Sequence, residues 1–258
     1  MKIISFVAIK GGVGKTTLCF NYGEWLASKG KKVLMIDSDH QCSLTQTYDI
    51  YTDSGTVSEI FKPNSKPKII KIKENLSLIP SDMLLDRLND ELQTKPNKEL
   101  MAYMWIADNY DELSKYDYII IDCHPDFSTV TQNMIAISDI LYSPIEPSEY
   151  GFRAKQNLTM RLDHMRKEVI DVMSRKSFVT ADLNYIGNRV KHNTSSSREF
   201  IEIMEKDKDT IALIPERELF NKSTLNHKSI FENDTSKLTN SEIELINKMN
   251  NLFEQITE

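Results

Sequence analysis

The feature that most constrains this chain is a glycine-rich turn near its N-terminus, at residues 10–17, with the sequence KGGVGKTT. An apolar run at residues 3–9 precedes the turn, and a helical pattern at residues 16–29 follows it. A glycine turn between a strand and a helix lets successive backbone N–H groups face one point. Together with the positive end of the helix, this geometry binds phosphate groups. The turn therefore predicts a phosphate site between a strand and a helix.

The turn matches the Walker A pattern G-x-x-x-x-G-K-[ST] at Gly14, Lys15 and Thr16, but it lacks the first glycine of the pattern and has Lys10 near that end. In that pattern the lysine, here Lys15, reaches the β- and γ-phosphates, and the hydroxyl of Thr16 ligates Mg²⁺. Lys10 places a second positive charge beside the nucleotide. Nucleotide contacts within the turn are also expected from Gly11, Gly12, Val13 and Gly14.

Length, charge and cysteine content narrow the class of protein. The 258 residues suffice for one large α/β domain, and the net charge of −6 excludes a globally basic nucleic-acid binder. Cys19, Cys42 and Cys123 lack C-x-x-C spacing, so neither a disulfide framework nor a zinc site is expected. The apolar N-terminus runs straight into the glycine turn without a cleavage region, which favours a strand over a signal peptide. No apolar run approaches membrane-spanning length, so a cytoplasmic location is expected.

Apolar runs alternate with helical patterns along the chain. Strands are expected at residues 3–9, 33–37, 76–80, 118–122, 140–143, 185–190 and 210–214. Helices are expected at residues 16–29, 83–93, 98–114, 129–137, 153–174, 196–206 and 241–256. The lysine- and proline-rich stretch 61–73 is typical of a solvated loop. The alternation predicts an α/β fold with one doubly wound, mostly parallel sheet and helices on both faces, in a single domain of residues 1–258. The C-terminal helix is expected to pack on that domain.

Acidic residues end two of the expected strands. Asp37 and Asp39 follow the run VLMI, and Asp122 follows the run YIII, as in a Walker B strand. The carboxyl ends of parallel strands face the ligand crevice. Asp37 and Asp122 are therefore expected to hold Mg²⁺, directly or through water, while Asp39 orients the attacking water. The alternative is that Asp37 and Asp39 only cap a helix or a turn. The Asp122 pattern alone is weak evidence for a Walker B strand, and it becomes strong evidence together with the glycine turn.

These motifs together resemble the ParA/MinD family of deviant Walker A ATPases, and most of all its ParA, or Soj-like, branch of plasmid and chromosome partition proteins. Besides the glycine turn, the match includes Asn21, and GKKVLMIDSDHQ at 30–41 resembles the family pattern G-K-x-V-L-L-I-D-x-D-x-Q. Further matches lie at residues 116–122, 143–149 and 214–215. The resemblance covers residues 2 to about 234, which is nearly the whole chain.

The resemblance implies a role for each matching residue. Lys15 would contact the β- and γ-phosphates, and Lys10 would cross a dimer interface to the nucleotide of the other subunit. Thr16 would ligate Mg²⁺ and Thr17 would contact the α-phosphate. Asp39 would position the attacking water. The remaining roles fall on Asp122 as the Walker B acid, Asn188 as an adenine contact and Pro215 in the loop over the base.

Two histidines depart from the family pattern. His40 stands where D-x-D-P-Q has proline, and His124 replaces a usual proline after the Walker B strand. Each is either a tolerated loop residue or a group that tunes the pH response near the nucleotide. The segment 216–222 also lacks the family's usual basic, serine and alanine pattern, which weakens any transfer of DNA-binding residues to it.

The resemblance implies nonspecific binding of DNA phosphates by basic side chains. The candidates in the C-terminal third are interleaved with acidic residues, so an ordinary mixed-charge surface is the alternative; they are Arg189, Lys191, Arg198, Lys222 and Lys228. The expected helix 153–174 is a second possible basic face. A membrane role is not expected, because the polar face of the last helix is mostly acidic and anionic lipid would repel it.

We therefore expect a Mg²⁺-dependent ATPase of the partition type, associated with the nucleoid. The resemblance implies a homodimer when ATP is bound, nonspecific DNA binding, and slow hydrolysis stimulated by a small centromere-binding, ParB-like partner. The alternative is an ATP-gated positioning or regulatory protein, similar to MinD, that acts on a protein or membrane target. A GTPase is not expected, because residues 188–191 lack the aspartate of the guanine-reading motif N-K-x-D.

Overall fold

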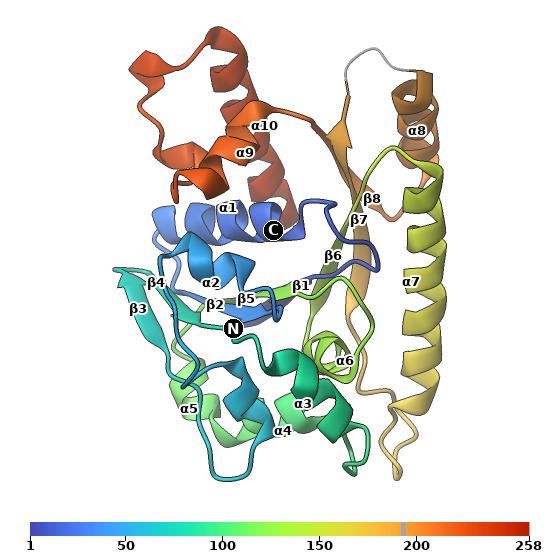
Figure 1. The fold of residues 1–258 in the computed structure, drawn as a ribbon. Coiled ribbons are helices and arrows are strands. Elements are labelled where there is room, and N and C mark those ends of the chain that lie inside the picture. The colour runs from blue at the N-terminus through green and yellow to red at the C-terminus, as the bar shows by residue number, and fades with distance from the viewer. Residues whose placement is uncertain (192–194, 258) are drawn as a thin grey trace.

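The computed structural model describes residues 1–191 and 195–257. These residues form an eight-stranded sheet in the order β3-β4-β2-β5-β1-β6-β7-β8 (Figure 1). Every neighbouring pair of strands is parallel except β3 and β4, which are antiparallel. The predicted α/β class, with a doubly wound and mostly parallel sheet, is confirmed.

The strands form where β-branched and other apolar residues follow one another, because both faces of the sheet are covered. In β1, for example, Ile3 faces one core and Ile4 the other. The strands are β1 (Lys2–Phe6), β2 (Val33–Ser38), β3 (Ile70–Lys73), β4 (Leu76–Ile79), β5 (Tyr118–Cys123), β6 (Ile140–Ile145), β7 (Asp182–Val190) and β8 (Thr210–Pro215).

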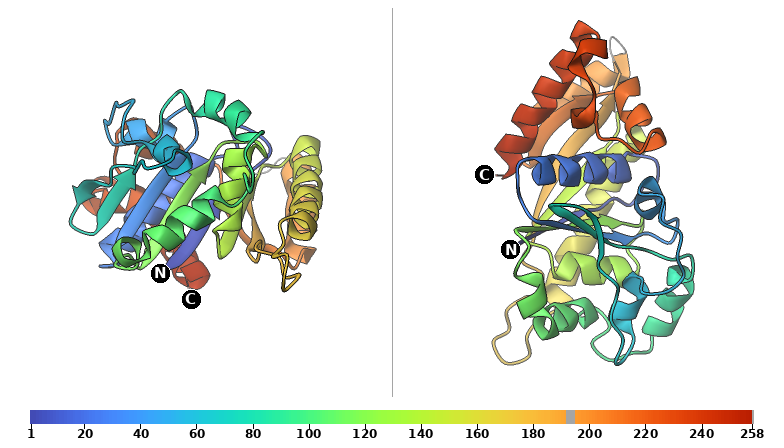
Figure 2. Two further views of the ribbon diagram at one scale, coloured as in Figure 1. Left: turned by 90° about the horizontal axis from the view of Figure 1, so that it is seen from below. Right: turned by 90° about the vertical axis from the view of Figure 1, so that its left-hand side faces the viewer.

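Different helices cover the two faces of the sheet (Figure 2). One face packs against α1 (Lys15–Ser28), α2 (Ser43–Thr47), α9 (Glu218–Leu225), the 3-10 turn η2 (Ile230–Glu232) and α10 (Asn240–Thr257). The other packs against η1 (Val57–Phe61), α3 (Leu85–Leu92), α4 (Met101–Asp108), α5 (Tyr110–Leu113), α6 (Thr129–Ala136), α7 (Glu149–Glu168) and α8 (Ser195–Lys206). A further 3-10 turn, η3 (Thr235–Lys237), precedes α10. Among the described residues, no helix combines the length and apolar character that crossing a membrane requires.

The structure corrects the sequence prediction in four places. The stretch 61–73, predicted as a loop, ends in the edge strand β3, whose Lys73 reaches the buried Glu24 of α1. The single helix predicted at 98–114 is two helices that meet at Asn109. The helix predicted from residue 153 begins at Glu149, because the Ser148 side chain caps its N-terminus. Finally, α2 and α9 were not predicted; both are short.

The C-terminal helix α10 packs on the rest of the chain, chiefly against α1. Met249 and Phe253 are buried, and the Phe253 ring lies edge-on to Tyr22 with centroids 5.0 Å apart. The indole N–H of Trp25 donates a hydrogen bond to Asn250 Oδ1 at 3.0 Å. The buried residues of α10 share one core cluster with residues of the sheet, and α10 and β8 line a common cavity. The sheet is reached at Tyr142, whose hydroxyl donates to the carbonyl of Ile256.

Candidate nucleotide-binding site

The glycine turn joins the end of β1 to the start of α1, as the sequence predicted. Gly12 has a φ of 77° and Gly14 a φ of 92°, a left-handed conformation that favours glycine. At Gly14 a Cβ atom would also lie only 2.5 Å from Nδ2 of Asn188. The turn can therefore bring its backbone close to a ligand only because these positions lack side chains. The first N–H groups of α1 then point towards that ligand.

Asp37 and Asp122 lie side by side at the carboxyl ends of two neighbouring strands. They are register partners in the β2–β5 pair, and both are fully buried. Burial, with the neighbouring carboxylate as a second cause, raises the pKa of Asp122 well above its ordinary value, and the Lys15 ammonium opposes this shift. Two buried carboxylates side by side are costly unless a cation shares them.

Asp122 is the better of the two carboxylates for direct metal binding. Neither of its oxygens has a hydrogen-bond partner in the part of the chain that the structure describes. A buried carboxylate without hydrogen-bond partners suits Mg²⁺, because this ion prefers oxygen ligands. In Asp37, by contrast, Oδ2 accepts hydrogen bonds from the N–H and the hydroxyl of Thr45, at 2.8 and 2.7 Å, and Oδ1 accepts one from the N–H of Asp39. Asp37 thus also fixes the segment that follows β2.

The two lysines of the glycine turn have different environments. Lys15 is buried, and its positive charge acts on Asp122. The ammonium of Lys10 forms an ion pair with Glu146, which follows β6, and the Lys10 side chain remains 36% exposed. Lys15 therefore lies inside the protein beside the strand-end carboxylates. Lys10 lies at the surface, paired with Glu146.

A cleft beside the glycine turn lies where the sequence placed the base contacts. Asn188 Nδ2 donates a hydrogen bond to the carbonyl of Val13 at 2.8 Å, and Arg189 donates to the carbonyl of Gly12. The cleft is lined by Asn188 and Arg189 together with Gly14, Thr17 and Pro215. Its cavity of about 40 Å³ is far below the volume of an ordinary small-molecule pocket. Binding of a base here requires this cleft to widen.

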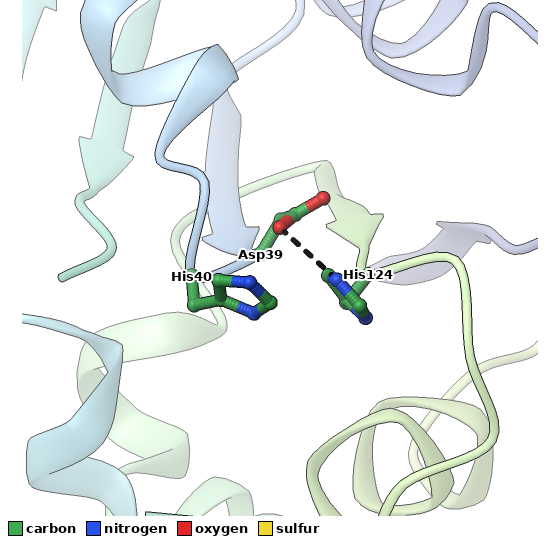
Figure 3. Close-up of side chains that lie close together, drawn as sticks. All are labelled: Asp39, His40 and His124. Atoms are coloured by element: carbon green, nitrogen blue, oxygen red, sulfur yellow. Dashed lines mark ion pairs between the residues drawn. The ribbon is translucent and has the colours of Figure 1, made fainter. Parts of the chain in front are cut away.

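Asp39 and the two histidines form a cluster next to this site (Figure 3). Asp39 follows the end of β2, and its Oδ1 accepts a hydrogen bond from the N–H of Gln41 at 2.9 Å. His124 Nε2 lies 3.9 Å from the same oxygen. The rings of His40 and His124 have centroids 4.3 Å apart. The sequence analysis considered each histidine by itself, as a tolerated loop residue or as a group that tunes the pH response. Their contact depends on the pairing of β2 with β5.

The candidate DNA-binding residues do not form one patch. Arg189 lines the nucleotide cleft, and Lys191 lies 4.0 Å from Glu216. Arg198 is exposed on α8, whereas Lys222 lies on α9 and Lys228 follows it, on the other side of the glycine turn in Figure 1. The second candidate face, on α7, is largely neutralised: Arg153, Lys155 and Arg166 pair with Glu149, Asp207 and Asp163.

Sequence reasoning assigned no role to three residues that shape the site. Thr45 holds Asp37, Glu146 holds Lys10, and Asn21 joins α1 to α9 and to the segment after it through the Ser223 and Ser229 side chains. Asn21 and Glu146 lie in segments that carry the family resemblance, which was a usable signal. No local pattern marks Thr45, since its partner is eight positions away across a loop.

Comparison with known proteins adds independent information. A family model described as an AAA domain (AAA_31) matches residues 1–175. The chain is 34% identical over 178 residues to the sporulation initiation inhibitor protein Soj of Bacillus subtilis, an alignment that covers 62% of this chain and 65% of Soj. It is 30% identical over 175 residues to the chromosome-partitioning ATPase Soj of Treponema pallidum, with 64% of each chain covered. The chain thus spans less than two thirds of the length of these relatives.

A solved structure extends the similarity to the whole chain. A plasmid partition protein of Borrelia burgdorferi B31, described as putative and bound to AMPPNP, superposes with a TM-score of 0.81 at 25% identity. The superposition covers 99% of this chain and 98% of that one. The sheet and its helices, including those beyond residue 175, therefore share one arrangement with a protein that binds an ATP analogue.

Proposed function

Since the chain belongs to the ParA/MinD family of deviant Walker A ATPases, on its ParA partition branch, we propose that it hydrolyses ATP to drive the partition of a plasmid or chromosome. The observation that carries this proposal is the buried, unpartnered Asp122 next to Lys15 and the left-handed glycine turn. A carboxylate in this position is costly unless it serves a bound cation. The arrangement suits Mg²⁺ and a nucleoside triphosphate.

In this proposal each residue of the glycine turn acts on the phosphates. The N–H groups of the turn and Lys15 bind the β- and γ-phosphates, and Thr17 contacts the α-phosphate. Asp122 and Thr16 hold Mg²⁺, with Asp37 fixing the neighbouring segment or binding through water; the bound metal supplies charge neutralisation at the phosphates. Asp39 orients the attacking water. Asn188 and Pro215 contact the base after the cleft widens.

Lys10 gives the protein its switch. We place it across the interface of an ATP-bound dimer, where its ammonium neutralises the charge that develops on the partner's nucleotide. Its position at the surface supports this role. The Lys10–Glu146 ion pair must break first, and a partly exposed pair of this kind costs only about 0–1 kcal/mol to break.

The nucleotide switch is tested by measuring mass in solution with ATP, ADP or no nucleotide, by light scattering after size exclusion. The wild type is expected to dimerise with ATP alone. Lys15→Ala loses the triphosphate contact and stays monomeric, and Lys10→Ala binds ATP but dimerises poorly. Lys31→Ala, an exposed lysine after α1, is the matched control and behaves as wild type. A wild-type protein that remains monomeric with ATP would refute the switch.

DNA binding and a partner protein complete the proposal. We assign to the dimer nonspecific binding of nucleoid DNA, and to a small centromere-binding protein the stimulation of hydrolysis. Retention on DNA with ATP, and not with ADP, is the expected result. No retention on DNA with ATP, with ADP or without nucleotide would favour the alternative, an ATP-gated positioning protein with a protein or membrane target.

A further inference from the structure

We propose that Asp39, His40 and His124 form a second cation site, specific for divalent transition metals such as Zn²⁺, that restrains ATP hydrolysis. One ligand atom from each residue lies within 4.8 Å of the others. Two imidazoles and a carboxylate favour Zn²⁺ and its neighbours over Mg²⁺, which prefers oxygen ligands. None of the three ligands is a cysteine, so the spacing of the cysteines along the sequence could not reveal this metal site.

The cluster is already close to coordinating geometry. Around a tetrahedral Zn²⁺ with bonds of 2.0–2.2 Å, ligand atoms lie about 3.4 Å apart. His124 Nε2 and Asp39 Oδ1 are 3.9 Å apart, and the two rings lie close together, as Figure 3 shows. Small side-chain rotations are therefore enough to close the site. Asp39 is fixed by its hydrogen bond from Gln41, while both imidazoles are partly exposed and can be reached from solvent.

Asp126 orients His124 for this role. Its Oδ2 lies 3.1 Å from His124 Nδ1, an ion-pair distance without the angles of a hydrogen bond, and Nε2 lies 3.9 Å from Asp39 Oδ1. The Asp126 carboxylate is itself held by the Thr131 hydroxyl at 2.7 Å and the N–H of Ser128 at 3.1 Å. A carboxylate behind a histidine is the usual arrangement in metal sites, because it fixes the ring and raises the basicity of the other nitrogen. A histidine that is only tolerated in a loop does not require a carboxylate next to its ring.

The site lies beside the phosphate-binding turn. The Lys15 ammonium acts electrostatically on His124, and a Cβ at Gly11 would lie 3.7 Å from Pro125. Three protein ligands leave a coordination position open for water or a phosphate oxygen. Under the proposed function, Asp39 orients the attacking water. A transition metal on Asp39 removes that carboxylate from its task, so hydrolysis slows.

Metal binding is tested without reference to ATP. The purified chain of 258 residues is titrated with Co²⁺ alone, and the visible d–d absorption of the bound ion is recorded. The wild type and His164→Gln, which removes an exposed histidine on α7, give the signal; His40→Gln and His124→Gln each reduce it at least tenfold. Asp126→Asn keeps all three ligands and weakens binding about 10–100-fold. Equal signals in all variants, or none in the wild type, would overturn the proposal.

The restraint on hydrolysis rests on the proposed function and is measured separately. With saturating Mg²⁺, micromolar Zn²⁺ is expected to slow ATP hydrolysis by the wild type and His164→Gln, each relative to its own rate in chelator. His124→Gln resists Zn²⁺. Equal inhibition of all three proteins would place the effect on ATP or on the Mg²⁺ site and refute the restraint. A protein that binds Co²⁺ but never hydrolyses ATP would refute the proposed function and leave the metal site standing.

Discussion

At the scale of single residues, three aspartates near one another differ in their hydrogen bonds. Asp37 accepts three hydrogen bonds from the segment after its own strand, and Asp122 accepts none from the described residues. Asp39 keeps an oxygen near His124, on the open side of the site. The sequence alone made Asp37 and Asp122 equivalent metal ligands. The structure favours Asp122 for direct contact.

Replacing Asp39 separates dimerisation from hydrolysis. Asp39→Ala removes the proposed orientation of water but no contact with the phosphates, so the ATP dimer is expected to persist while kcat falls about 100-fold or more. Phosphate release and light scattering on the same sample measure both effects. Asp53→Ala, in an exposed turn, is the matched control. Unchanged turnover in Asp39→Ala would contradict the assigned role.

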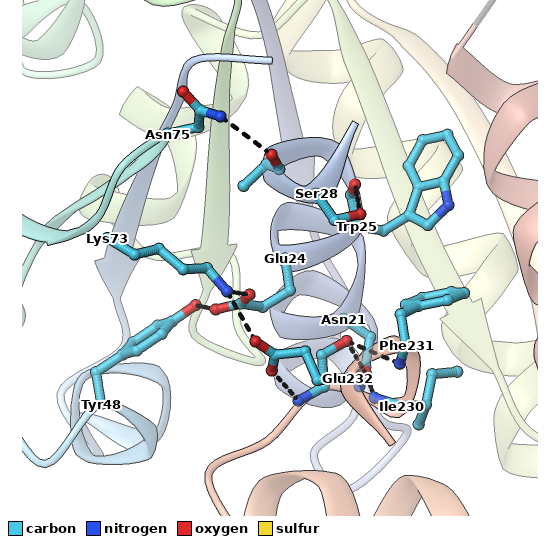
Figure 4. A network of polar contacts seen from close by, with 12 residues as sticks. Asn21, Glu24, Trp25, Ser28, Tyr48, Lys73, Asn75, Ile230, Phe231 and Glu232 are labelled. Atoms are coloured by element: carbon cyan, nitrogen blue, oxygen red, sulfur yellow. Dashed lines mark hydrogen bonds and ion pairs between the residues drawn. The ribbon is translucent and has the colours of Figure 1, made fainter. Parts of the chain in front are cut away.

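At the scale of elements, a polar network ties the edge of the sheet to α1 (Figure 4). Lys73 of β3 pairs with Glu24, which is 4% exposed, and with Glu232 at 3.2 Å. The Tyr48 hydroxyl donates to Glu24 at 3.0 Å. A buried carboxylate needs such partners, since it cannot be hydrated. The network therefore explains why a lysine-rich stretch becomes a strand at the sheet edge.

Removing Lys73 is expected to cost stability that a second substitution restores. Lys73→Met leaves the buried Glu24 without a cation and with only its hydrogen bond from Tyr48, and we expect a loss of about 1–3 kcal/mol, reduced from the fully buried case because Lys73 is partly exposed. Lys73→Met with Glu24→Gln recovers part of this loss. Urea denaturation of the four proteins measures the coupling. Additive effects would contradict a direct pairing.

The same variant carries a pH signature. Burial raises the pKa of Glu24 above its ordinary value, against the effect of Lys73. A carboxylate with a raised folded-state pKa binds more protons in the folded state, so stability falls as the pH rises from the ordinary value through the raised one. Without Lys73 the pKa rises further. The destabilisation by Lys73→Met is thus expected to grow as the pH rises above the ordinary pKa of a glutamate, about 4.3.

At the scale of the whole molecule, an acidic protein must bind DNA, if it does so, through a local surface. Arg198 is exposed on α8, which contacts the first turn of α7 through the Phe200 and Phe152 rings, whereas Lys167 is exposed in the last turn of α7; Figure 1 shows the two ends of this long helix. The two residues therefore provide a matched pair for locating that surface.

Salt dependence distinguishes these two positions. If Arg198 contacts a DNA phosphate, Arg198→Ala weakens ATP-dependent DNA retention and lowers the slope of log K against log salt by about 1 per subunit. Lys167→Ala leaves the slope unchanged. Fluorescence anisotropy on a random-sequence duplex at several salt concentrations measures both. Equal slopes for the wild type and Arg198→Ala would remove α8 from the DNA surface.

The sequence by itself determined the features that consecutive residues encode. The glycine turn requires left-handed backbone at fixed positions, the apolar runs require buried strands, and the order of elements then admits a doubly wound sheet. These requirements act over a few residues, so a pattern in the chain reveals them. The sequence did not predict that the helix at 98–114 is split or that β3 is a strand, because contacts with distant elements outweigh local preference there.

Only the tertiary structure decided which distant side chains meet. Lys10 and Glu146 are 136 positions apart, and they pair because β6 lies next to β1 in the sheet. His40 and His124 meet because β2 pairs with β5, which brings the segments after these two strands together. Strand order sets these encounters, and strand order depends on the packing of the whole chain. The spacing of two residues along a sequence carries no record of it.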